Sequence, residues 1–325
     1  METTSLNKQS NECQQELANP IDLRLRNLSY SSLNLLHSCP RKYELTKLQS
    51  IDSYQEDIDT QITFAFGHAV GDGIALILAG HDIEYVMWRV FLAWPLDTTW
   101  QHSKSRKSLS LAIVALQKFN SLKHEILDIE NWEVLSFNGK PAIELSLKLN
   151  FPGNFYYRGY IDIVLQHKLT KKVLVVECKT TAAKSLSEAQ YQNSNQATGY
   201  AVILDHIFHG LTDYEVLYLV YQTEYMEYHP FRFNKGMQRK AQWIAEVLLD
   251  IEMIKKYNEY GIYPTHGDHC IAYNKVCRFF DLCHMSNTYL TKPLTEEAIA
   301  QILAENEKNF EIKVDVAELI KSRID

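Results

Sequence analysis

Hydrophobic and polar positions alternate most regularly in two neighbouring stretches near the middle of the chain, at 156–166 and 172–180. In the first stretch the odd positions are mostly apolar, so Asp162 points to the other face of a strand. In the second stretch Glu177 and Lys179 are two residues apart and share one face. Because a polar, basic turn separates the two stretches, we predict a β-hairpin. In it Asp162, Glu177 and Lys179 converge at one end.

Apolar periodicity predicts further elements on both sides of this hairpin. Pro40 starts a second helix, or kinks the first, after a helix start capped by Ser31 or Ser32. Ser185 or Ser187 caps a later helix that runs to about Phe208. A strand that follows a helix, at 214–222, indicates a crossover and a mixed sheet. The predicted fold is therefore α/β, with a central mixed β-sheet flanked by helices. The other expected helices lie at 64–78, 82–130 with a break at Pro95, 237–257, 295–306 and 314–323. The other strands are expected at 132–137, at 142–151 after a turn at Asn138-Gly139, and at 228–234 as a short edge strand.

The chemistry of the predicted trio is that of a cation site. Two carboxylates with open positions suit Mg²⁺ or Mn²⁺. A metal held in this way can generate hydroxide and orient a phosphate, and a lysine beside it can position the attacking water. Taken alone, Asp162, Glu177 and Lys179 are more often solvated strand charges. Glu144, on the preceding strand, is likewise expected to be an exposed strand charge rather than a support for the metal.

Composition narrows the class of protein. The chain has 325 residues, of which 46% are hydrophobic and 22% charged, as in soluble globular proteins. No apolar run approaches the roughly 18–20 residues of a membrane helix, and the N-terminus does not read as a secretory signal. We therefore expect a cytoplasmic location and no membrane. The formal net charge of −7 does not indicate nucleic-acid binding, so basic residues would have to act locally. Candidates lie at 104–107, 168–172 and 232–240.

The cysteines suggest a second metal site. Cys270, Cys277 and Cys283 are spaced C-x6-C-x5-C, and Cys39 lies far upstream. In a cytosolic chain, clustered cysteines indicate metal or redox sites before disulfides. Four thiolates are enough for a tetrahedral zinc or a [4Fe–4S] cluster, although Cys39 alone would usually be a small buried hydrophobe. The spacing leaves the cluster, zinc and plain thiols open.

Aromatic residues are concentrated between positions 85 and 100. We expect them to pack in the core, and the alternative is a platform on which single-stranded bases stack. The five residues are Tyr85, Trp88, Phe91, Trp94 and Trp100.

Three short motifs in order resemble the PD-(D/E)XK nuclease superfamily. They are GYID around Asp162, VVECKT around Glu177 and Lys179, and QATGY with Gln196 and Tyr200. The resemblance spans about 28–285 and is closest to the RecB-like branch, which includes the Cas4 and AddB nuclease modules. Ile161 replaces the proline of the superfamily's name, as RecB-like members often show.

Two further matches extend this resemblance. CPRKYEL at Cys39 is similar to the N-terminal cysteine motif of Fe–S-containing RecB-like nucleases. Gly67-His68 matches the helix that supplies a histidine metal ligand in that family, and an imidazole ligand would favour Mn²⁺ over Mg²⁺. The last three cysteines are spaced more widely at the first pair than the family's usual pattern.

The resemblance implies a restriction-endonuclease-like core. In it a four-Cys metal cluster would clamp the N- and C-terminal helical parts together. The resemblance also implies a role for each motif residue. Asp162, Glu177 and Lys179 would be catalytic, and Gln196 and Tyr200 would brace the site close to DNA. Mn²⁺ or Mg²⁺ would be held by His68, Asp162, Glu177 and the Cys178 backbone carbonyl. The [4Fe–4S] cluster, with zinc as the alternative, would be held by Cys39, Cys270, Cys277 and Cys283.

The function implied is a metal-dependent deoxyribonuclease, more an exonuclease on single-stranded ends than an endonuclease. It would act in recombination, repair or CRISPR-adaptation-like DNA processing, with a helicase or another protein of those pathways as partner, in a bacterial or phage-infected cell. The alternatives are a Fe–S DNA-binding or partner-recruiting subunit and a structure-specific endonuclease. The expected domains are a flexible N-terminus at 1–26, the nuclease domain at 27–290 and a helical tail at 291–325.

Overall fold

The computed structural model describes residues 21–48, 57–98, 106–208, 215–272, 275–283 and 311–315. The chain divides into two compact units, each built from separated segments. The first contains residues 1–50, 151–157 and 245–306, and the second contains 51–150, 158–244 and 307–325. Strand β6 (Phe155–His167) and helix α9 (Met237–Tyr260) each contribute to both units. The domain limits at residues 27, 290 and 291 stay predictions.

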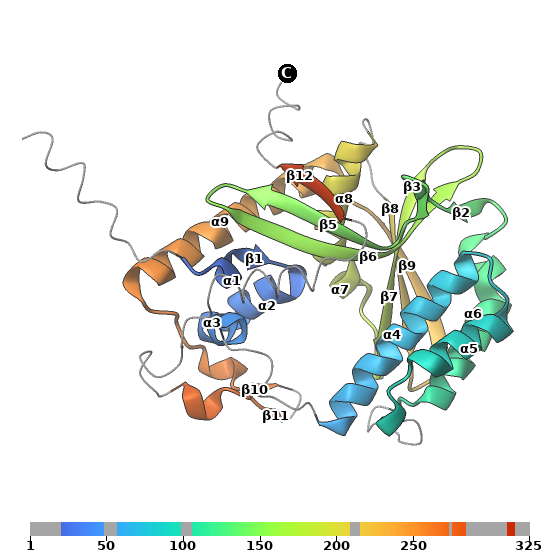
Figure 1. Cartoon of the computed structure of the whole chain (residues 1–325), viewed down its shortest axis with the longest axis horizontal. Helices are drawn as coiled ribbons and strands as arrows, with labels where there is room; N and C mark the ends of the chain where they lie inside the picture. Colours follow the sequence, from blue (N-terminus) through green and yellow to red (C-terminus); the bar gives the residue numbers. More distant parts are fainter. Residues whose placement is uncertain are drawn as a thin grey trace, which may run out of the picture. The chain divides into compact units, whose positions relative to one another are not determined.

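A mixed β-sheet forms the framework of the second unit, as the sequence predicted (Figure 1). Strand β7 is antiparallel to β6 and parallel to β8, and β9 is antiparallel to β8. The β9 edge position confirms the prediction for 228–234. The order is β12 (Glu311–Asp315), β5 (Ile143–Phe151), β6, β7 (Val173–Thr181), β8 (Glu215–Gln222) and β9 (Glu227–Asn234), and β2 (Trp132–Val134) also pairs with β6.

The predicted central hairpin is confirmed. Ile163 lies opposite Val176 and Leu165 lies opposite Leu174. All four side chains are buried in one hydrophobic core. Because side chains alternate along a strand, Asp162 and Glu177 point to the opposite face of the sheet.

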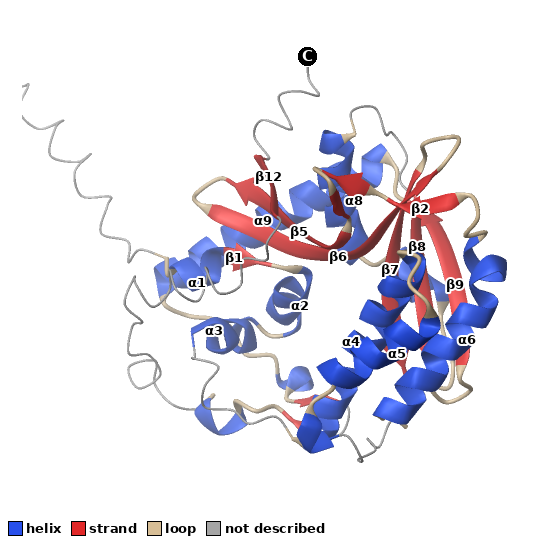
Figure 2. Cartoon of the chain, turned by 45° about the vertical axis from the view of Figure 1, so that its right-hand side comes forward, coloured by secondary structure: helices blue, strands red, loops and turns tan. Residues whose placement is uncertain are grey.

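Helices cover both faces of this sheet. Helices α4 (Ile58–Leu78), α5 (Ile83–Ala93) and α6 (Leu109–Leu127) pack on the face that carries Val176 and Leu219 (Figure 2). On the other face α7 (Glu188–Gln192) places the Tyr191 ring 5.5 Å from that of Tyr218, and α8 (Gln196–Ile207) follows. The sequence predicted one helix at 185–208. That prediction is wrong at 193–195, where the chain turns between α7 and α8.

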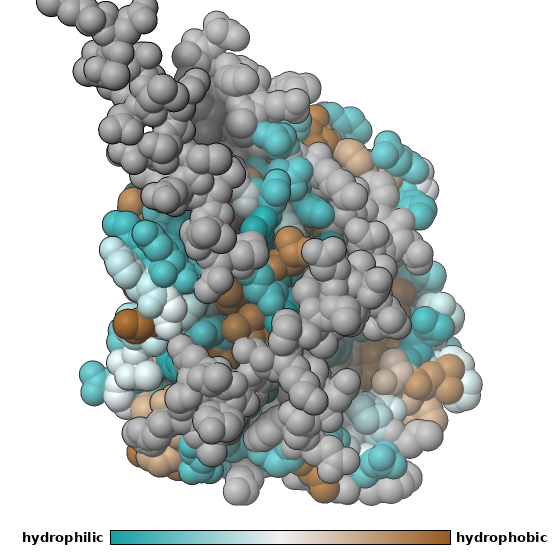
Figure 3. Space-filling model, turned by 60° about the vertical axis from the view of Figure 1, so that its left-hand side comes forward, coloured by the Kyte–Doolittle hydropathy of each residue, from teal (hydrophilic) through white to brown (hydrophobic). Residues whose placement is uncertain are grey.

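Helix α4 is, within the part of the chain that the structure describes, the one helix long and apolar enough to cross a membrane. Half of its apolar window is buried inside the fold. On the face drawn in Figure 3, hydrophobic side chains form separate patches among hydrophilic ones.

The packing of α4 against α6 makes a specific prediction at Gly73. A Cβ atom there would lie 2.5 Å from Leu116 Cδ2, whereas one at Gly67 would lie 3.8 Å from Thr180 Oγ1. Both Gly→Ala changes gain the same intrinsic helix propensity, but only Gly73→Ala overpacks the core. We expect Gly73→Ala to be less stable than Gly67→Ala by about 1–3 kcal/mol in urea unfolding. Equal stabilities would show that α6 moves away at little cost.

The first unit contains the N-terminal helices. They are α1 (Leu23–Arg26), α2 (Tyr30–Ser38) and α3 (Pro40–Leu48), and the short strand β1 (Asn27–Leu28) pairs with the start of β6. Pro40 begins α3 as predicted. The cap of α2 is Ser29 rather than Ser31 or Ser32, because its Oγ accepts from Ser32 N at 3.2 Å while Ser32 Oγ accepts from Ser29 N at 2.7 Å.

Two other local predictions were tested. Asn138 and Gly139 have positive φ angles of 49° and 76° and turn β3 (Ser136–Phe137) into β4 (Lys140–Pro141), which confirms the predicted turn. The helix predicted at 314–323 is wrong at its start, because Val314 and Asp315 belong to β12 and pair with β5. The helix predicted at 295–306 lies outside the described residues.

Candidate active site

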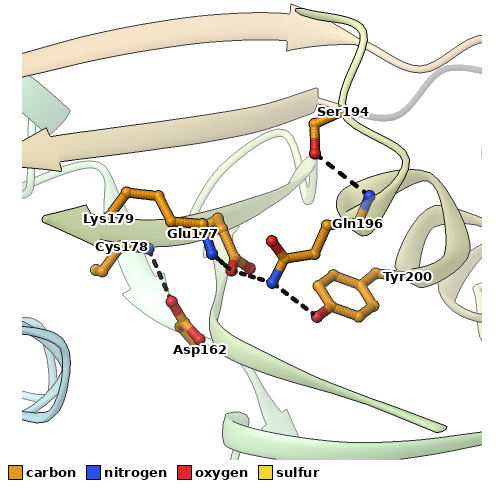
Figure 4. A network of polar contacts seen from close by, with 7 residues as sticks. All are labelled: Asp162, Glu177, Cys178, Lys179, Ser194, Gln196 and Tyr200. Carbon is orange, nitrogen blue, oxygen red and sulfur yellow. Dashed lines mark hydrogen bonds and ion pairs between the residues drawn. The ribbon is translucent and has the colours of Figure 1, made fainter. Parts of the chain in front are cut away.

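Asp162 and Glu177 face each other just beyond the last paired rung of the central hairpin. Ile163 pairs with Val176, so the next two positions lie opposite each other where β6 and β7 separate. The Cys178 backbone N–H donates to Asp162 Oδ2 at 2.8 Å and fixes the orientation of that carboxylate (Figure 4). The Cys178 side chain points away from Glu177, toward α4, where a Cβ at Gly71 would lie 3.9 Å from its own.

Glu177 is the centre of the polar network. Its Oε1 accepts from Lys179 Nζ at 2.7 Å and from Gln196 Nε2 at 2.5 Å. Gln196 Nε2 also lies 3.3 Å from Tyr200 Oη, one turn further along α8 (Figure 4). The structure therefore brings together Asp162, Glu177, Lys179, Gln196 and Tyr200, as the sequence motifs indicated. Their roles stay predictions.

Two basic residues, Lys235 just before α9 and Arg239 in its first turn, hold the turn that precedes Gln196. Lys235 Nζ donates to Gln192 O at 2.6 Å and to Ser194 O at 3.2 Å, and Arg239 donates to Asn195 Oδ1. Lys235 is buried, which lowers its pKa to about 8. The expectation that residues 232–240 offer a basic surface to DNA is therefore wrong for Lys235. Its side chain is buried, and its ammonium group donates to two backbone carbonyls instead of facing solvent.

The electrostatics of the site favour a cation. Burial, and then the charge of Glu177, raise the pKa of Asp162 well above its ordinary value, and burial raises the pKa of Glu177. Burial alone would lower the pKa of Lys179, but the charge of Glu177, the hydrogen bond to it and the charge of Asp162 together outweigh burial, and the pKa is raised. Lys179 stays an ammonium, and it does not fully compensate the two carboxylates.

A third carboxylate contributes to this field. Glu144 is partly buried at the start of β5, and its charge raises the pKa of both Asp162 and Glu177. Its φ angle is 49°, which a non-glycine residue rarely adopts. The interpretation of Glu144 as an exposed strand charge was wrong, because its side chain is partly buried. The only signal in the sequence was its place on a neighbouring strand.

The two central carboxylates fit a hard divalent cation. Glu177 is 1% exposed, and its Oε2 has no hydrogen-bond partner among the residues that the structure describes. A buried acceptor of this kind is costly unless something binds it. Across the described ranges, no group of three or more His, Cys, Asp or Glu side chains forms a ready-made ligand set. Mg²⁺ commonly binds through one or two carboxylates, with water and substrate phosphate completing its shell, so this donor set is compatible with it.

His68 lies on α4, not on the strands β6 and β7 or the helix α8 that carry the polar network. It is exposed and lines a cavity of about 430 Å³ against α5. The charges that shift the pKa of Asp162 come from Glu177, Lys179 and Glu144, and those that shift the pKa of Glu177 come from Lys179 and Glu144. A role for His68 as a metal ligand stays a prediction.

The four predicted cysteine ligands meet in the first unit. Cys39, Cys270, Cys277 and Cys283 line one cavity of about 210 Å³. Burial raises the pKa of Cys283, and the charges of the other three cysteines raise it further, so all four lie within electrostatic reach.

The long gap between the first two C-terminal cysteines has a structural reason. The strands β10 (Ile271–Ala272) and β11 (Lys275–Val276) pair antiparallel, and Cys277 N donates to Cys270 O at 2.7 Å. A short hairpin therefore occupies the extra residues and returns Cys277 beside Cys270. The wider spacing does not separate the thiols.

The aromatic residues near α5 do not all pack in the core. Trp94 is buried, which confirms the prediction for that residue. Tyr85, Trp88 and Phe91 are exposed, and the last two rings are stacked with centroids 6.1 Å apart. The core prediction is wrong for these three because they lie on the face of α5 opposite its buried residues, Val86 and Val90. Trp100 lies outside the described residues.

Comparison with known proteins identifies the class. The model of the PD-(D/E)XK nuclease superfamily matches residues 27–284, which include every motif discussed above, and the chain belongs to this superfamily. Members generally use divalent metals such as Mg²⁺ or Mn²⁺.

The solved structures add likenesses of fold only. The crystal structure of a candidate exonuclease from Eubacterium rectale covers 88% of this chain and 100% of its own, with a TM-score of 0.46 and 9% identity. The structure of SSO0001 covers 69% of this chain and 86% of its own, with a TM-score of 0.26 and 13% identity. Both scores are too low to define an activity. No curated protein matches the chain.

Proposed function

We propose that this protein is a metal-dependent deoxyribonuclease in which Asp162 and Glu177 hold Mg²⁺ or Mn²⁺ and Lys179 is catalytic. The observation that carries the proposal is the buried Glu177 Oε2, which has no hydrogen-bond partner within the described ranges although Oε1 is bound by Lys179 and Gln196. One oxygen is fixed by the protein and the other remains available. This arrangement suits a carboxylate that binds a cation.

Each side chain has a distinct task in phosphodiester hydrolysis. A bound cation would supply charge stabilisation and an activated water. Lys179, ion-paired to Glu177, is placed to orient the attacking water or to neutralise charge on the phosphate oxygens. Gln196 keeps the Glu177 carboxylate in one orientation, and the Cys178 N–H does the same for Asp162. His68 and the Cys178 carbonyl are proposed as further ligands by family resemblance.

We further propose that Cys39, Cys270, Cys277 and Cys283 hold a [4Fe–4S] cluster. Their cavity of about 210 Å³ is several times the roughly 30 Å³ that one water occupies. A single zinc, the alternative, would draw four sulfurs to about 2.3 Å, and among the described residues no ligand set is preformed for either group. The charge of the buried Arg41 offsets part of the rise in the pKa of Cys283.

The proposed reaction is exonucleolytic and acts on single-stranded ends. The test is incubation of the full-length protein with a linear single-stranded oligonucleotide and, separately, with circular single-stranded DNA, in Mn²⁺, in Mg²⁺ and in EDTA. We expect stepwise shortening of the linear strand with either metal, intact circles and no reaction in EDTA. Nicked circles would establish an endonuclease, and no metal-dependent cleavage of either DNA would overturn the proposal. A cytoplasmic location and a partner from recombination, repair or CRISPR adaptation stay predictions.

A further inference from the structure

A second cavity lies outside the polar network of Glu177. It has a volume of about 430 Å³ and is lined by α4, by α5 and by Trp94 and Pro95 just after α5. Figure 2 shows the two helices side by side. The volume falls within the roughly 300–1,000 Å³ of small-molecule sites, and the lining is mostly apolar with a few polar side chains, as in such sites.

One of the residues that line the cavity carries a buried hydrogen-bond donor without an acceptor. Trp94 is 3% exposed and lines the cavity, and its indole Nε1–H has no partner among the described residues. Buried Trp N–H groups usually find an acceptor, and leaving one unpaired is costly. A ligand whose acceptor reaches this N–H, after a small shift of the indole ring, would satisfy it.

The remaining lining residues narrow the chemistry of that ligand. Phe64 lines the cavity and is 54% exposed, so its ring is available for stacking. Arg89 supplies a cation that can pair with phosphate, and Gln61 and Asp72 supply amide and carboxylate groups. A flat ring with both donors and acceptors on its edge, attached to a phosphate, matches this set. Those are the features of a nucleobase in a DNA strand.

Helix α4 connects this cavity to the strand that carries the catalytic residues. Cβ atoms at Gly67 and Gly71 would lie 3.8 Å from Thr180 Oγ1 and 3.9 Å from Cys178 Cβ, so α4 packs directly on β7. Asp72 lines the cavity one position after Gly71, and its charge reaches the Cys178 thiol. A strand bound at the cavity would therefore contact the helix that packs on β7, on the face of the sheet opposite Glu177 and Lys179.

We propose that the α4–α5 cavity binds one unpaired base of the DNA strand that the enzyme processes, with Phe64 stacking on the base, Trp94 Nε1–H donating to its edge and Arg89 contacting the adjoining phosphate. This inference rests on the proposed nuclease function. A base paired in a duplex has its edge and faces occupied and does not enter, so the cavity selects single-stranded DNA.

Binding in EDTA tests the inference without cleavage. Fluorescence anisotropy of a labelled oligothymidine, titrated with the full-length protein, compares wild type with Phe64→Ala, Arg89→Ala and Trp94→Phe. The matched control is Tyr225→Ala, because Tyr225 is 53% exposed in the same unit and does not line the cavity. We expect Phe64→Ala to weaken binding about fivefold or more, with the smallest change for the control. Unlabelled single strands should compete far better than blunt duplex of the same length.

Two outcomes overturn the inference, and they are separable from failure of the nuclease proposal. One is equal affinity of wild type, Phe64→Ala and Arg89→Ala for the single strand while wild type still cleaves DNA in Mn²⁺. The other is equal competition by duplex. If wild type binds single strands in a Phe64-dependent manner but never cleaves them, base binding at the α4–α5 cavity is supported and the nuclease proposal is contradicted. Trp94→Phe removes only the N–H, so its folded state is checked by its unfolding temperature.

Discussion

Lys179→Ala and Asp162→Asn are each expected to reduce Mn²⁺-dependent DNA cleavage by roughly 10²–10³-fold, the scale on which enzymes lose rate when one preorganised charge-stabilising group is removed. Lys179 is ion-paired to Glu177 at 2.7 Å, and Asp162 is the second of the two central carboxylates. Cleavage is measured with the linear single-stranded oligonucleotide under initial-rate conditions. The matched control is Lys172→Ala, an exposed lysine on the turn before β7, which should retain its activity.

Metal binding separates loss of chemistry from loss of fold. A cation at 100 times its Kd stabilises the folded state by about 2.7 kcal/mol, and this gain should be absent in Asp162→Asn. The variant keeps an oxygen that can accept from Cys178 N, so its backbone contact is retained. A thermal unfolding series in Mn²⁺ measures the effect. Full cleavage by either variant would contradict the proposed mechanism.

The same variant has an expected pH signature in the absence of metal. Asp162 and Glu177 have raised pKa values in the fold, so the folded protein binds more protons than the unfolded chain between the ordinary and the raised values. Stability of the metal-free protein therefore falls as pH rises through that window. Asp162→Asn removes one of the repelling charges and should flatten this fall. An unchanged pH dependence of the unfolding temperature would show that the two carboxylates do not repel each other in the fold.

The second large effect is expected at the cysteine cavity. Cys277→Ser should abolish the visible absorption and the bound iron of anaerobically purified protein. It should also lower the free energy of unfolding by about 2–5 kcal/mol, the cost typical of losing a native crosslink. The clamp connects Cys39 to residues more than 200 positions away, so its loss frees a long loop in the unfolded chain. Iron and zinc are quantified on the same sample.

Cys178→Ala is the matched control for this experiment. Cys178 is a free cysteine that does not line the cysteine cavity, and burial raises the pKa of its thiol well above the ordinary value. The control should keep its full iron content. A colourless wild type with one zinc would replace the cluster by a single-ion site. A wild type that contains neither iron nor zinc would contradict a metal site at the four cysteines, and only the proposed cation site at Asp162 and Glu177 would remain.

The sequence by itself determined the central hairpin and the residues that meet on it. Side chains alternate strictly along a strand, so the spacing of Asp162, Glu177 and Lys179 is enough to fix their common face. The four-residue spacing of Gln196 and Tyr200 has the same effect on α8. The motifs also indicated the superfamily that the comparison then established. These are local relations, and local geometry is nearly invariant between proteins.

Tertiary structure decided the relations that depend on packing between distant segments. The charge of Glu144 acts on Asp162 because β5 lies beside β6 in the sheet. The β10–β11 hairpin brings Cys277 back beside Cys270 despite the wide C-x6-C spacing. Lys235 looked like a surface charge because nothing in its own neighbourhood shows that the turn before α8 covers it. Tyr85, Trp88 and Phe91 share a helix with buried residues, and only the packed core showed which side of α5 faces solvent. Composition and periodicity give the kind of residue on each face, whereas the fold determines what that face meets.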